Sequence, residues 1–334
     1  MQVLVAGPED GVMIPIPQYP AYTAQISLLG GTEAPYYLKE SDGWGVHTAE
    51  LTASYEKCVK ESKATPRLFV AINPGNPTGN VLERSVMEDM VRFCHDHNMV
   101  LLADEVYQVN IYACNKEFKS FREVVLQMPE PYNKTMLVSL HSTSKGVIGE
   151  CGRRGGYFEE LNIPADLHAQ IVKMSSINIC SNVNGQVMTA LMCTPPAPGG
   201  ESYASFMKEF TDIFDDMKTR AAMLAKELNT IVGFSCQLVE GAMYAFPCLT
   251  VPAKYAKHND EQNAKEGRKL TLDARWALEL LESEGIVVVP GSGFGQEPDT
   301  LHFRTTILPP TEQMARMVKS IRTFQEGLYA KYKD

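Results

Sequence analysis

One lysine of the chain lies among small hydroxyl residues and a glycine, in the stretch STSKG at positions 142–146. Arg154 follows nine residues after Lys145, directly before two glycines. A lysine amine can hold an aldehyde as a Schiff base, and a guanidinium binds a phosphate through paired, charge-assisted hydrogen bonds. Lys145 and Arg154 together therefore predict a cofactor that carries both groups, pyridoxal 5'-phosphate (PLP). Standing alone, Lys145 would be an ordinary surface lysine before a glycine turn.

Four polar groups each follow an apolar run that is typical of a buried strand. Tyr19 follows the run 12–16, Asn76 follows 68–72, Asp104 follows 99–103 and Lys145 follows 136–140. In open parallel sheets, ligands bind beyond the carboxyl ends of the strands. We therefore expect these four side chains to lie around one site.

Three of the polar side chains match the needs of the PLP ring. Asp104 would pair with the pyridine nitrogen and keep it protonated, which lets the ring accept electrons. Asn76 and Tyr107 would donate hydrogen bonds to the phenolic oxygen, although the prolines and glycines of 73–79 are also consistent with a simple turn. An apolar run before Asp104 also resembles the metal-binding strand of an ATPase, but the chain contains no G-x-x-x-x-G-K-[ST] motif.

The phosphate, the face of the ring and the substrate have candidate partners as well. Ser142 and Arg154 are placed to bind the phosphate. The ring of Tyr19 could lie flat against the pyridine, or be an ordinary aromatic residue in a loop. Arg304 falls on the opposite strand face from Phe303, where it could bind a substrate α-carboxylate, although a salt bridge is the more frequent fate of a single arginine.

The elements that position these groups alternate between strand and helix in the first half of the chain. After the strand 68–72, Ser85 and Glu88 form a capping-box pattern, and apolar residues then recur at helical spacing as far as Asn98. The strand 99–103 completes a βαβ unit, which implies a parallel sheet covered by helices on both faces.

A change of composition near residue 195 predicts a boundary between two domains. The segment PPAPGG at 195–200 can continue neither a helix nor a central strand, and a long apolar stripe at helical spacing follows it as far as residue 228. Beyond that stripe we expect strands at 241–247, 286–289 and 301–307 and helices at 272–283 and from 311. The predicted parts are a large cofactor-binding domain (1–194), a linker with a bridging helix (195–230) and a smaller α/β domain (231–334).

Composition and charge exclude several classes of function. The 334 residues are 44% hydrophobic and 21% charged, with a formal net charge of −9 and no cluster of basic residues, so we expect neither a nucleic-acid partner nor a membrane span. The eight cysteines form no C-x-x-C pair, and His95 and His97 point to different faces of a helix, so no metal site is predicted. The first ten residues lack the pattern of a signal peptide, which favours the cytoplasm.

The complete set of motifs resembles the class I/II aminotransferases of PLP fold type I, in the expected order and over essentially the whole chain. The signature consists of four short motifs: Asn76-Pro77-x-Gly79, Asp104-x-x-Tyr107, Ser142-x-x-Lys145 and Arg154-x-Gly156. Longer stretches are similar to the alanine aminotransferase branch: 16–20 (IPQYP), 73–79 (NPGNPTG), 102–108 (LADEVYQ), 141–146 (HSTSKG), 149–152 (GECG) and 290–296 (PGSGFGQ).

This resemblance implies a homodimer that converts L-alanine and 2-oxoglutarate to pyruvate and L-glutamate in a ping-pong cycle. Lys145 would be the Schiff-base and proton-transfer residue, and the other candidate residues would keep the roles given above. Many relatives place the phosphate arginine eight residues after the lysine, at Arg153, whereas the following Gly-Gly favours Arg154. Related transaminations of glyoxylate or of an aromatic amino acid are the alternatives.

The resemblance also has one departure, at the amino terminus. Family members carry a longer segment before the IPQYP motif, with a loop that grips the phosphate at a helix N-terminus, but only eighteen residues precede Tyr19 here. We expect part of the phosphate seat to be missing, apolar surface to be exposed, and a fragment with impaired PLP binding to be the rival to an active enzyme. A missing segment could also have carried a mitochondrial signal.

Overall fold

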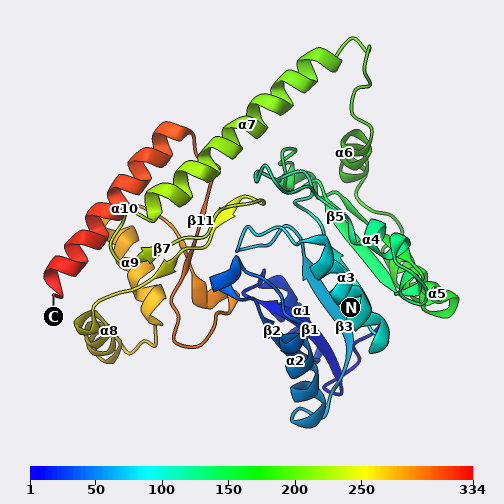
Figure 1. Cartoon of the computed structure of the whole chain (residues 1–334), viewed down its shortest axis with the longest axis horizontal. Helices are drawn as coiled ribbons and strands as arrows, with labels where there is room; N and C mark the ends of the chain where they lie inside the picture. Colours follow the sequence, from blue (N-terminus) through cyan, green and yellow to red (C-terminus); the bar gives the residue numbers. More distant parts are fainter. Residues whose placement is uncertain (334) are drawn as a thin grey trace.

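A six-stranded sheet forms the centre of the first half of the chain in the computed structural model, which describes residues 1–333 (Figure 1). Its strand order is β2-β1-β3-β4-β5-β6, and all neighbouring pairs are parallel except β5 with β6. The predicted α/β class with a mostly parallel sheet is confirmed. The strands are β1 (Asp10–Ile16), β2 (Thr32–Tyr37), β3 (Thr65–Ile72), β4 (Val100–Asp104), β5 (Leu137–Ser142) and β6 (Gly156–Leu161).

Side chains alternate between the two faces of this sheet, as strand geometry requires. On β3, Phe69 and Ala71 pack into one core with α2 (Thr48–Lys60), α3 (Arg84–Asp96) and α4 (Phe121–Gln127). Leu68 and Val70 face the opposite core, beneath α1 (Ala21–Leu29). Helices thus flank both faces. The second face keeps an apolar cavity of about 320 Å³ between β4, β5 and α5 (Ala165–Ser175).

The predicted capping box at the start of α3 is wrong. Glu83 is the N-cap, no side chain caps the helix, and Ser85 lies inside the first turn. Glu88 instead accepts hydrogen bonds from Arg84 at 2.9 Å and from Arg92 at 3.2 Å. Two arginines one turn away on either side therefore compete with the cap for this carboxylate.

The chain beyond β6 exposes a band of apolar side chains. It passes through α5, the short helix η4 (Ser176–Asn178) and α6 (Val183–Cys193) before the 195–200 segment. The exposed fractions of its large apolar residues lie between 51% and 91%: Val172, Ile177, Ile179, Val183, Val187 and Leu191. These side chains form an exposed apolar surface on one part of the molecule.

A second hydrophobic core lies in the C-terminal part. It joins the second half of α7 (Tyr203–Leu228) with α9 (Leu272–Glu284) and α10 (Thr311–Lys331), around the buried rings of Trp276 and Phe303. The first half of α7 extends away from this core toward α6 (Figure 1). This arrangement is consistent with the predicted bridging helix, and the exact domain limits remain a prediction.

The strands of this part are shorter than predicted. A three-stranded sheet has the order β10-β11-β8, and β7 pairs with β9 in a separate ribbon. Ala242 has a left-handed φ of 60°, so the strand expected at 241–247 begins only at Tyr244, and Pro247 follows its end. The strands are β7 (Phe234–Ser235), β8 (Tyr244–Ala245), β9 (Cys248–Leu249), β10 (Val289–Pro290) and β11 (Phe303–Thr306).

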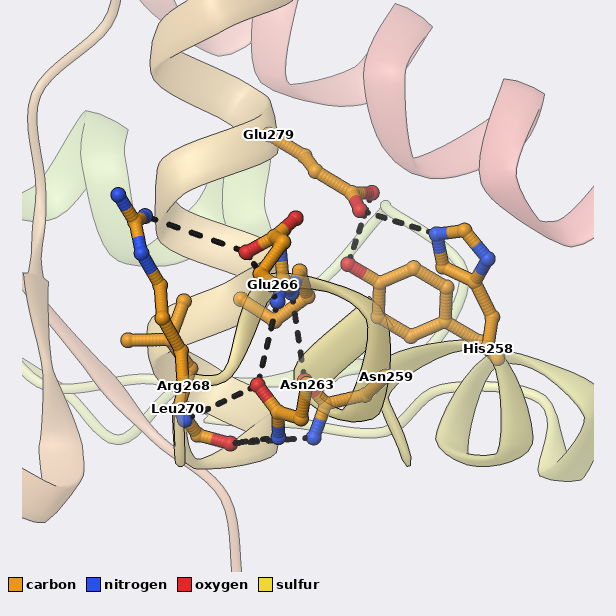
Figure 2. Close-up of polar contacts among 9 residues, drawn as sticks. His258, Asn259, Asn263, Glu266, Arg268, Leu270 and Glu279 are labelled. Carbon is orange, nitrogen blue, oxygen red and sulfur yellow. Dashed lines mark hydrogen bonds and ion pairs between the residues drawn. The ribbon is translucent and has the colours of Figure 1, made fainter. Parts of the chain in front are cut away.

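Polar contacts fix the loop between α8 (Ala253–Glu266) and α9, as Figure 2 shows. The Asn263 amide bonds both backbone groups of Leu270, at 2.9 and 3.1 Å. The buried guanidinium of Arg275 bonds both carboxylate oxygens of Glu266 at 3.1 Å. This bidentate pair holds the end of α8 against α9.

Within residues 1–333, no helix has the combination of length and apolar character needed to cross a membrane.

Candidate active site

A cavity of about 530 Å³ lies beyond the carboxyl ends of β3, β4 and β5. The β3–β4 pairing sets Ile72 beside Asp104, and the β4–β5 pairing sets Asp104 beside Leu140. Parallel register therefore brings the three strand ends to one edge. All the predicted site residues line this cavity: Tyr19, Asn76, Asp104, Tyr107, Ser142, Lys145, Arg154 and Arg304.

Asp104 sits at the floor of the site with a hydrogen-bond partner that the sequence reasoning missed. The Tyr22 hydroxyl donates to Asp104 Oδ2 at 2.7 Å, and the Val106 backbone N–H points to Oδ1 at 3.4 Å. Burial raises the pKa of the Asp104 carboxyl, and these two hydrogen bonds partly offset the shift. A cation beside Asp104 would stabilise its ionised form. Tyr22 lies two residues after the IPQYP motif, but nothing in its spacing indicates this contact.

Arg304 is held by aromatic rings. Its Cζ lies 4.1 Å from the ring centroid of Tyr244 and 4.7 Å from that of Phe294. Arg304 Nη1 also donates to Asn76 Oδ1 at 3.2 Å. The described structure records no ion pair for Arg304, so the salt-bridge alternative does not apply to this conformation. The guanidinium lines the cavity beside these rings, where it could bind an anion.

Lys145 lies in the turn that follows β5. The Ser142 hydroxyl accepts a hydrogen bond from the Ser144 backbone N–H at 3.1 Å, which tightens this turn below the lysine. The antiparallel pairing of β5 with β6 places Ser142 opposite Gly156. A Cβ atom at Gly156 would approach the His141 carbonyl oxygen to 2.8 Å, so a glycine is required for this close pairing.

The two candidate phosphate arginines differ in position. Arg154 lines the cavity and donates to the Cys151 carbonyl oxygen at 3.0 Å. Arg153 is not among the described residues that line the cavity, and its Nε lies 3.5 Å from Glu150 Oε2. Arg154 also has a left-handed φ of 58°, which is uncommon for a residue other than glycine. The geometry thus favours Arg154 as the group that could hold a phosphate.

Aromatic residues and a histidine complete the walls. Tyr107 is buried and packs edge-on against Tyr244 with 6.1 Å between the ring centroids, and burial raises the pKa of Tyr107. Tyr19 is more open, with 45% of its surface exposed. His141 was not predicted: burial lowers its pKa, and its Nδ1 is buried with no hydrogen-bond partner among the described residues. Its place in the HSTSKG motif is the only sequence signal for it.

The fold and this set of side chains are those of PLP fold type I. Residues 1–321 match the family described as aminotransferase class I and II. The chain belongs to this family, so the resemblance is confirmed. An alanine aminotransferase from Pyrococcus furiosus has the same fold, with a TM-score of 0.79 and 23% sequence identity over 98% of this chain and 73% of that chain.

Relatives of this chain include enzymes with two different substrate names. Alanine aminotransferase 1, mitochondrial, of Arabidopsis thaliana is 44% identical over the whole chain, and human alanine aminotransferase 1 is 40% identical over 99% of it. Glutamate–glyoxylate aminotransferase 2 of Arabidopsis thaliana is 43% identical over the whole chain. The chain spans 60%, 66% and 69% of the lengths of these three relatives, respectively.

Proposed function

We propose that this chain carries out PLP-dependent transamination, with L-alanine and 2-oxoglutarate converted to pyruvate and L-glutamate. The observation that carries the proposal is the single cavity that gathers Lys145, Asp104 and Arg304 from distant parts of the chain. An amine, a buried carboxyl and an oriented guanidinium are the three groups that amino-acid chemistry on PLP needs. Class I and II aminotransferases are PLP-dependent enzymes, and the chain's membership of that family supports the cofactor.

The residues present fit the cofactor at its reactive end. When bound, PLP supplies an electron sink for the pair released at the substrate Cα. Asp104 would pair with the pyridine nitrogen, whose positive charge would offset the burial that raises the pKa of this carboxyl. Ser142 and Arg154 would hold the phosphate, while Asn76 and Tyr107 would bond the phenolic oxygen and Tyr19 would contact the ring.

Two residues would act directly on the amino acid. Arg304 would bind its α-carboxylate, since the Tyr244 and Phe294 rings fix the plane of the guanidinium. This contact would orient the Cα–H bond toward Lys145, whose amine would take the Cα proton as a general base. The same two residues would serve the second half-reaction with the 2-oxo acid.

Glutamate–glyoxylate transamination is the second candidate. Relatives with that name are 42–43% identical to the chain, and relatives named alanine aminotransferase are 40–45% identical. Sequence identity to these relatives therefore does not distinguish glyoxylate from pyruvate as the 2-oxo acid that is exchanged with glutamate. Both are small 2-oxo acids that Arg304 would bind in the same way.

Borohydride trapping tests the proposal. The protein is incubated with PLP and reduced, and the modified residue is located by peptide mass spectrometry. We expect the pyridoxyl group on Lys145, and we expect Lys145→Arg, which keeps the charge, to abolish the label at this position. Absence of label, or label spread over surface lysines, would favour the fragment with impaired PLP binding.

A half-reaction panel then tests the substrate. Alanine, glutamate, glycine, aspartate and tyrosine are added separately to the PLP-loaded protein, and the change in cofactor absorbance is followed. We expect alanine and glutamate to change the cofactor absorbance. If glycine and glutamate change it and alanine does not, the glyoxylate reaction is supported. If tyrosine reacts in place of alanine, the aromatic alternative holds.

Assembly and location are proposals as well. The homodimer is supported by the exposed apolar band of α5, η4 and α6, which a second copy could cover. Light scattering after size-exclusion chromatography would test the homodimer, with a monomer as the contrary result.

The sequence favours the cytoplasm as the location of the protein, but three relatives are named mitochondrial, which supports the mitochondrial alternative. Fractionation of cells that express the protein separates the two.

A further inference from the structure

Three side chains with metal-binding donors meet where the first half of the chain contacts the C-terminal strands. Glu40 begins the short helix η1 (Glu40–Asp42), Cys248 begins β9, and His302 directly precedes β11. A carboxylate oxygen, the thiol sulfur and a ring nitrogen of these residues all lie within 4.8 Å of one another. A backbone bridge between Cys248 and His302 sets two of the three donors side by side.

His302 lies between two acceptor oxygens in this cluster. Its Nδ1 lies 3.1 Å from the amide oxygen of Gln296, and its Nε2 lies 3.1 Å from Glu40 Oε2. A neutral imidazole has one N–H, so one of these two acceptors faces a bare nitrogen. The other oxygen of Glu40, Oε1, is buried and has no hydrogen-bond partner among the described residues. A cation between the donors would satisfy Nε2 and the carboxylate together.

We propose that Glu40, Cys248 and His302 bind a zinc ion at this junction. A thiolate, an imidazole and a carboxylate are all ligands that Zn²⁺ accepts, and three protein ligands leave a fourth position for water. The Gln296 side-chain oxygen would accept a hydrogen bond from His302 Nδ1–H, which leaves Nε2 free to bind the ion. On binding, the Cys248 thiol releases its proton to solvent, and no electron is transferred.

The ion would connect two parts of the chain that also build the candidate active site. Glu40 and His302 are 262 residues apart in the sequence. Arg304 lies two residues after His302, on β11, and Gln296 lies two residues after Phe294, which stacks on Arg304. Zinc would thus hold η1 against the strands that carry Arg304. The proposal does not depend on transamination, because zinc binding is measurable without substrate.

Cobalt substitution tests the thiolate directly. Co²⁺ is added to the purified full chain without PLP, and the spectrum is recorded against the same protein without metal. We expect a near-ultraviolet thiolate-to-cobalt band together with visible bands of a four-coordinate ion, both removed by excess Zn²⁺. Cys248→Ser should lose the thiolate band, whereas Cys114→Ser, which removes an exposed thiol elsewhere, should keep it.

Zinc affinity supplies the second measurement, by competition with a chromogenic chelator. Gln296→Ala should weaken binding by about 10- to 100-fold, as for other outer-shell partners, and Cys248→Ser and Glu40→Gln by at least as much. Circular dichroism shows whether each variant is folded. If the unmodified protein gives no thiolate band, or if the folded Cys248→Ser variant binds zinc as tightly as the unmodified protein, the proposed site does not exist.

Discussion

Glu105 makes a specific prediction about stability and pH. It follows Asp104 directly, only 6% of its surface is exposed, and it accepts a hydrogen bond from the Phe121 backbone N–H at 2.7 Å. Burial raises the pKa of Glu105 to about 7 from its ordinary value of 4.5, and the neighbouring charges of Asp104 and Glu159 add to the shift. The folded protein therefore holds a proton on Glu105 at pH values where the unfolded chain has lost it.

The sign and size of the effect follow from proton linkage. Between pH 4.5 and 7 the folded state binds more protons at Glu105 than the unfolded state, so the free energy of unfolding falls as the pH rises. One pKa unit corresponds to about 1.4 kcal/mol, so a shift from 4.5 to about 7 costs roughly 3 kcal/mol above pH 7. Below pH 4.5 both states are protonated and this cost disappears.

Glu105→Gln removes the titration and keeps an acceptor for the Phe121 N–H. We expect the stability of the variant relative to the unmodified protein to rise by roughly 2.5 kcal/mol between pH 5 and pH 8, because only the unmodified protein must ionise a buried carboxyl at position 105 over that range. Urea unfolding of both proteins at these two pH values, without PLP, measures the difference. Parallel stability profiles, with a constant difference between the two proteins, would refute the reasoning.

Three further predictions concern the candidate site and the packing around it. Arg304→Lys keeps the charge but loses the plane that stacks on Tyr244, so the KM for the amino acid should rise roughly 10- to 100-fold in half-reaction assays, and an unchanged KM would exclude a carboxylate role. Replacing glycine by alanine usually stabilises a helix by about 0.5–1 kcal/mol. Gly185→Ala should instead lower the free energy of unfolding in urea, because the new Cβ would lie 2.9 Å from the Arg153 carbonyl oxygen. A more stable variant would contradict this close approach. Arg275→Ala should lower the free energy of unfolding in urea, since it removes a buried guanidinium that bonds both carboxylate oxygens of the exposed Glu266, and an unchanged free energy would show that solvent already screens the pair.

The sequence by itself determined the family, the parallel sheet and the residues at the strand ends. Apolar runs followed by Asn76, Asp104 and Lys145 are local patterns, and parallel strands necessarily bring their carboxyl ends to one edge. The long helical stripe before residue 228 is equally local, and it became α7. Such features depend on the period of side chains along one element, which the sequence records directly.

Only the tertiary structure decided which residues contact one another across elements. Tyr22 and Asp104 are 82 positions apart, and Arg304 and Asn76 are 228 apart, so no spacing rule connects them. The capping box failed for a related reason, because Arg84 and Arg92 compete for Glu88 once the helix is formed. Contacts of this kind depend on how whole elements pack, and packing is fixed by the sum of many weak interactions rather than by any one motif.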